Sequence, residues 1–141
     1  MSARDREYDR FGPWVLEISD EDPVPPLFEA HLEGREAPIL AIKVPRRITR
    51  REAHPGMDLY DYVVGLYEGD ILVIERVAGA GPGGDTRSRV RARTIAYDEV
   101  RHVSVHEELL AGVLRLGVAR EPFALPYNAV SKDVMGRVVE L

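Results

Sequence analysis

The second half of the chain is built from short runs in which apolar and polar residues alternate, with turn residues between them. Glu68-Gly69 joins two of these runs at a tight-turn signal, which predicts a hairpin. Period-two alternation over runs spaced eight to twelve residues apart is typical of antiparallel strands. We therefore predict strands over residues 60–67, 70–77, 87–97, 100–106, 114–118 and 122–126.

Two earlier strands and one short helix are predicted upstream. Residues 11–19 alternate, and residues 37–44 are rich in apolar side chains and end at Pro45. Between them, apolar residues at helical spacing follow Pro25 and Pro26 and end at Gly34, which predicts a short helix. Residues 71–74 are apolar at every position, which favours a central strand that is buried on both faces.

The chain ends in a predicted amphipathic helix. Ser131 is a good N-cap, and apolar side chains recur on one face at Val130, Val134, Val138 and Leu141. The fold class expected is thus mainly β (α+β), an antiparallel β-sandwich or barrel with a C-terminal amphipathic helix.

The length of 141 residues suits one domain with a substantial core. We expect residues 1–10, almost all charged or polar, to form a flexible tail, and residues 11–141 to form a single domain with an N-terminal extension (11–59). The chain has no cysteine, no apolar signal segment and no apolar run long enough to cross a bilayer. A cytoplasmic location without a transmembrane segment is the resulting expectation.

Four segments of the second half form one pattern: residues 67–74, residues 95–100 (IAYDEV), residues 109–114 (LLAGVL) and residues 126–131 (PYNAVS). Together they resemble bacterial pleckstrin-homology-like domains, best over residues 60–141. In that family a Y-D-E turn leads into a strand, an L-L-x-G-x-L hairpin follows, and P-Y-N-x-V-S opens the last helix. The upstream part is similar to a largely uncharacterised set of bacterial proteins with this layout. The resemblance implies a two-sheet or barrel-like β-structure plugged by a helix; it implies no reaction.

No cofactor or metal site is predicted. Residues 79–84 satisfy G-x-G-x-x-G, but a period-two arginine segment follows where a dinucleotide site needs a helix, so the glycines indicate a hairpin loop. His102 and His106 lie on one predicted strand about 13 Å apart, too far to share one ion. A loop could in principle bring together three metal-ligating side chains, His54, Asp58 and Asp61, but their spacing matches no known metal-binding motif. The sequence also contains no arrangement of residues typical of a catalytic site. We expect a protein that is not an enzyme.

Two basic groups are the candidate ligand-binding residues. The first is a run of five cations without an intervening acid, which we place on a loop: Lys43, Arg46, Arg47, Arg50 and Arg51. The second is a ladder of arginines about 6.6 Å apart on one strand face: Arg87, Arg89, Arg91 and Arg93. Either group could bind an anionic partner. The alternative, which we favour, is that these arginines and the lysine form ion pairs inside the molecule. The partners could be Glu68, Asp70 or Glu75, or acids of the N-terminal third, which contains ten acidic residues and four arginines.

The function expected from these observations is a binding or scaffolding module of the pleckstrin-homology-like type. Protein interaction or self-association through a sheet edge or outer face is the leading form of it. Binding of an anionic ligand or phosphate headgroup through the basic loop is the alternative, and a hydrolase has no support. Because the chain carries a net charge of −5, no sequence-specific nucleic acid is expected as a partner.

Overall fold

The computed structural model describes residues 8, 11–46, 48, 51–53, 57–77, 89–108, 111–118, 121–128 and 131–140. The predicted tail, apart from residue 8, and the glycine loop lie outside the described residues, as do Arg47, Arg50, His54 and Arg87.

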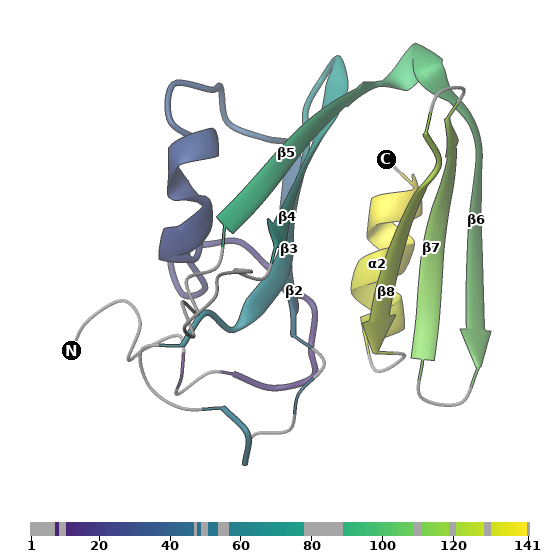
Figure 1. Cartoon of the computed structure of the whole chain (residues 1–141). Helices are drawn as coiled ribbons and strands as arrows, with labels where there is room; N and C mark the ends of the chain where they lie inside the picture. The colour runs from purple at the N-terminus through teal and green to yellow at the C-terminus, as the bar shows by residue number, and fades with distance from the viewer. Residues whose placement is uncertain are drawn as a thin grey trace, which may run out of the picture.

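Two antiparallel sheets and one C-terminal helix make up the described fold, which confirms the predicted class (Figure 1). The first sheet contains five strands in chain order: β1 (Leu16–Glu17), β2 (Leu40–Pro45), β3 (Tyr60–Leu66), β4 (Asp70–Val77) and β5 (Arg89–Ala96). The second contains β6 (Val100–Glu108), β7 (Ala111–Val118) and β8 (Phe123–Asn128). A short 3₁₀ helix, η2 (Tyr97–Glu99), joins the sheets, and α2 (Lys132–Glu140) lies between them.

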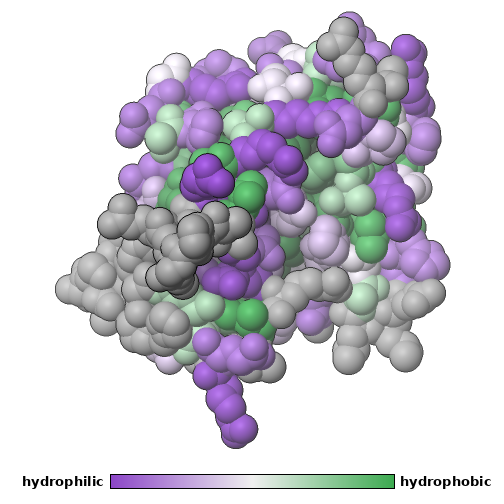
Figure 2. Space-filling view, viewed as in Figure 1, coloured by the Kyte–Doolittle hydropathy of each residue, from purple (hydrophilic) through white to green (hydrophobic). Residues whose placement is uncertain are grey.

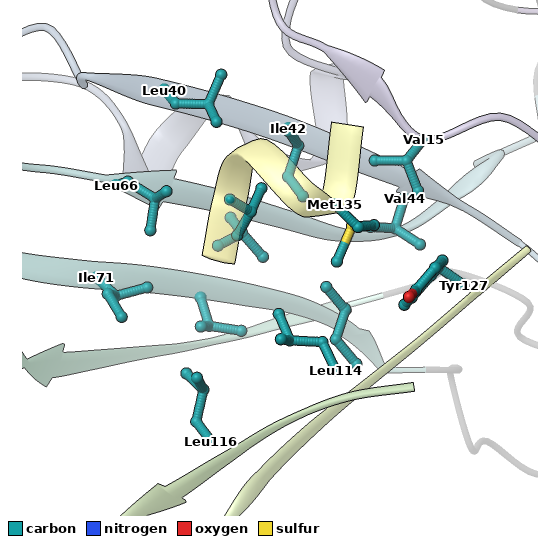
Figure 3. Close-up of a cluster of buried hydrophobic side chains, with 14 of the residues drawn as sticks. Val15, Leu40, Ile42, Val44, Leu66, Ile71, Leu114, Leu116, Tyr127 and Met135 are labelled. Carbon is teal, nitrogen blue, oxygen red and sulfur yellow. The ribbon is translucent and has the colours of Figure 1, made fainter. Parts of the chain in front are cut away.

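The centre of the first sheet is buried on both faces, as the apolar run in β4 predicts. On the inner face, Ile71 and Val73 join a core cluster with the second sheet and with Met135 and Val138 of α2 (Figure 3). On the outer face, Leu72 and Ile74 pack in a second cluster with residues of the N-terminal extension. The short 3₁₀ helix η1 (Pro26–His31) stands where a helix is predicted and contributes the buried Phe28 to that cluster.

The first predicted strand is much shorter than expected. Residues 11–19 alternate, but only Leu16–Glu17 pair with β2. Pro13 has no N–H to donate, and the N–H of Val15 donates to the Ser131 hydroxyl at 2.7 Å instead of to a neighbouring strand. Ser131 thus stands just before α2, as predicted, and also ties the extension to the start of the helix.

Candidate ligand-binding cleft

An apolar cleft of about 270 Å³ lies between the two sheets. Strand alternation builds its walls, because every second residue of each strand points toward the opposite sheet. The register places Val103 opposite Leu116 and Leu125 opposite Leu114 in the second sheet. The lining comes from both sheets, from η2 and from the end of α2: Val64, Leu66, Ile71, Val73, Tyr97, Val100, Val103, Leu114, Leu116, Phe123, Leu125, Val138 and Val139.

The wall contains one side-chain polar atom, the Tyr97 hydroxyl, which is already bonded. It donates to the backbone oxygen of Tyr67 at 2.6 Å. Burial raises the pKa of Tyr97, with a smaller effect from the charge of Asp70, so the phenol stays neutral. Because the other lining side chains are hydrocarbon, the described walls offer a ligand dispersion and desolvation rather than directional bonds.

One side of the cleft is closed by contacts that cross from sheet to sheet. The rings of Tyr62 and Phe123 meet edge to face, with centroids 6.2 Å apart. The Arg93 guanidinium donates a hydrogen bond to the backbone oxygen of Glu121, just before β8. These contacts hold the start of β8 against the first sheet.

The opposite side is open along β6. Val103 and Val105 face inward, opposite the buried Leu116 and Leu114, yet they are 44% and 42% exposed. Val139 of α2, which also lines the cleft, is 42% exposed. A ligand could enter along β6 without unfolding either sheet. On the face of the molecule seen in Figure 2, apolar residues reach the surface among polar ones.

At the far end of the second sheet, Tyr127 and Glu107 form a bond that depends on a glycine. The Tyr127 hydroxyl donates to Glu107 Oε1 at 2.7 Å, crossing the β7 backbone at Gly112. Burial raises the pKa of Tyr127, and the Glu107 carboxylate raises it further. A Cβ at position 112 would lie 2.5 Å from Cζ of the Tyr127 ring, so Gly112 is required for this packing.

The predicted basic loop is not brought together as one exposed group. Lys43 lies in β2 and not on a loop; it is 3% exposed, its Nζ donates to the Pro23 oxygen at 2.9 Å, and it sits over the Tyr60 ring. Arg46 donates to the backbone oxygen of Asp58, and burial lowers its pKa, with a smaller effect from Arg76. Arg51 is exposed in a turn.

The arginine ladder on β5 has internal partners at two of its positions. Arg91 lies directly opposite Glu75 on β4 and pairs with it at 2.7 Å, as the alternative of internal pairing anticipates. The hydrogen bond to Glu75 is the main reason that the pKa of Arg91 is raised. Arg93 makes the contact to Glu121 described above, and Arg89 is exposed.

No group of three or more metal-ligating side chains exists among the described residues. His102 and His106 are both exposed on the outer face of β6. The Asp61 carboxylate forms an ion pair with the Arg76 guanidinium at 2.8 Å. His54, the third member of that predicted group, lies outside the described residues.

Sequence reasoning did not identify the cleft, although the signal was present in the inward positions of β7 and β8. Those positions read as ordinary core, and only the distance between the sheets shows that they leave a space. Comparison with protein-family models, with curated proteins and with solved structures finds no match. No helix within the described ranges is long and apolar enough to span a membrane.

Proposed function

We propose that this protein is a binding module whose inter-sheet cleft receives a small apolar molecule or the apolar part of one. The single observation that supports this function is the cleft itself, about 270 Å³ lined by hydrocarbon side chains. A closed apolar cavity of about 150 Å³ is enough to bind benzene. The cleft therefore has room for a ligand nearly twice that size.

The apolar lining of the cleft supports the same proposal on energetic grounds. An apolar occupant would remove hydrocarbon of the lining from water, which contributes about 25 cal/mol for each Å² covered. Because the cleft exists only in the folded chain, an occupant would stabilise the folded state.

Binding of an anionic ligand through the basic loop receives less support. Lys43 is buried and Arg46 is bonded to the backbone, which removes two of the five cations from a common exposed surface. The resemblance to pleckstrin-homology-like domains and a scaffolding role remain predictions.

Displacement of the fluorescent probe N-phenyl-1-naphthylamine by a series of n-alkanols tests this function. Each added methylene that enters the cleft contributes about 0.8 kcal/mol, so affinity should rise roughly fourfold per carbon. The rise should stop once the chain is longer than the cleft. A probe that does not bind, or an affinity that rises without a plateau, would contradict the proposal.

Two tryptophan substitutions at the end of α2 locate the site. Val139→Trp places a large ring at the mouth of the cleft and should weaken probe binding at least tenfold. Glu140→Trp adds the same ring at the neighbouring exposed position, which does not line the cleft, and should leave binding unchanged. Equal affinities of the two variants would place the binding site elsewhere.

A further inference from the structure

β6 is the longest edge strand of the described fold; its bulge at Arg101 and its charged residues lie toward its ends, and its centre, residues 102–106, contains neither. β1 is only two residues long, β5 carries exposed arginines, and β8 contains Pro126, which has no N–H. β6 spans nine residues with no proline, and residues 101–107 are all exposed. A long edge strand with apolar side chains is the kind that recruits a further strand.

The sequence of β6 is complementary to itself when two copies run antiparallel. If Ser104 lies on the two-fold axis, Val103 of one copy faces Val105 of the partner subunit. Arg101, the extra residue of the bulge beside Val100, then lies near Glu107 of the partner subunit, and each pair occurs twice. Moving the axis to Val103 would place Arg101 against a valine, and moving it to Val105 would place Glu107 against a valine. Only the central register pairs apolar with apolar and cation with anion.

The groups that this register needs are available in the structure. Arg101 is the extra residue of the bulge between Val100 and His102, and no partner for it exists among the described residues of its own chain. Glu107 accepts the Tyr127 bond through Oε1, which leaves Oε2 for a second donor. When the two-fold axis is perpendicular to the sheet, the inward faces of both copies lie on the same side of the joined sheet. The exposed Val103 and Val105 of the two copies therefore lie together.

From these observations we infer that two copies of this chain associate through β6, antiparallel and centred on Ser104, to form one continuous six-stranded sheet. The open side of each cleft then lies beside Val103 and Val105 of the partner subunit. The inference concerns the outer edge of β6 and does not depend on a ligand in the cleft.

Cysteine cross-linking tests the register directly, because the chain has no native cysteine. Directly opposed Cβ atoms lie about 4.5–5.5 Å apart, close to what a disulfide needs. Ser104→Cys should therefore oxidise to a covalent dimer. His106→Cys alone should not, because it faces His102 of the partner subunit, but a mixture of the His102→Cys and His106→Cys proteins should cross-link. All three positions are exposed.

Charge reversal provides an independent measurement by analytical ultracentrifugation. Arg101→Glu places two carboxylates opposite each other and should weaken association at least tenfold. Arg101→Glu combined with Glu107→Arg restores both pairs and should recover most of the affinity. Arg89→Glu, the same change at an exposed arginine of β5 in the first sheet, is the control and should leave association unchanged.

The proposal is overturned if Ser104→Cys and His106→Cys cross-link equally, or if the unmodified protein stays monomeric up to about 1 mM. It is also overturned if Arg101→Glu associates as well as the parent protein. Val139→Trp should cross-link normally in the Ser104→Cys background, so a failure of the cleft proposal and a failure of the dimer proposal give different results.

Discussion

Gly112 on β7 offers a test of how Tyr127 packs, because the packing decides whether alanine at this position stabilises or destabilises the protein. Replacing glycine by alanine usually stabilises a protein by about 0.4–1 kcal/mol, because the unfolded chain loses freedom. At Gly112 we expect the opposite. The new Cβ would lie 2.5 Å from Cζ and 2.7 Å from Cε2 of the Tyr127 ring, well inside ordinary contact.

The size of the effect follows from what Tyr127 must give up. Its ring is 2% exposed in the inter-sheet core, so displacing it costs about 1–3 kcal/mol of overpacking. Its hydroxyl bond to the Glu107 carboxylate is also strained or lost, which costs up to about 1.5–3 kcal/mol. After the favourable glycine-to-alanine contribution, Gly112→Ala should destabilise the protein by about 3 kcal/mol.

Gly136→Ala is the matched control. Gly136 is exposed on α2, and nothing lies within 4 Å of an added Cβ, so alanine should stabilise the helix by about 0.8–1 kcal/mol. Urea unfolding measures both changes, and for a chain of this length about 4 °C in Tm accompanies each kcal/mol. In a Tyr127→Leu background, Gly112→Ala should lose most of its cost because the clashing ring atoms are gone. A neutral or stabilising Gly112→Ala in the parent protein would refute the reasoning.

Two further predictions concern buried polar contacts. Ser131→Ala removes the acceptor for the buried N–H of Val15 and should lower the free energy of unfolding by about 1–3 kcal/mol. Ser104→Ala, at an exposed site, should lower it by less than about 0.5 kcal/mol. Equal losses of the two variants in urea unfolding would contradict this. Stability should also fall above about pH 10, because unfolded tyrosine then releases a proton that Tyr127, with its raised pKa, retains. The unfolded state binds fewer protons in that range, so unfolding becomes easier as pH rises. Tyr127→Phe should show a shallower decline between pH 9 and 11, and identical slopes would count against the assignment.

Local patterns in the sequence were sufficient for β2 to β8 and for the C-terminal helix, but not for the first strand. Period-two alternation located β3 to β8 within a few residues, because side-chain direction in a strand depends only on local backbone geometry. The apolar run in β4 showed that this strand is covered on both faces. The first strand was overestimated because its backbone donor at Val15 is used by Ser131, 116 residues away along the chain.

The sequence by itself determined that this chain forms antiparallel sheets closed by a helix, since each of those features follows from residues within a few positions of one another. Only the tertiary structure decided which charges are paired, that Lys43 is buried, and that the sheets leave a cleft open along β6. Those outcomes depend on strand register and on the distance between two sheets. A tight turn fixes the register only within its own hairpin, whereas pairing across the longer loops and the spacing between the sheets are set by contacts between residues far apart in the chain.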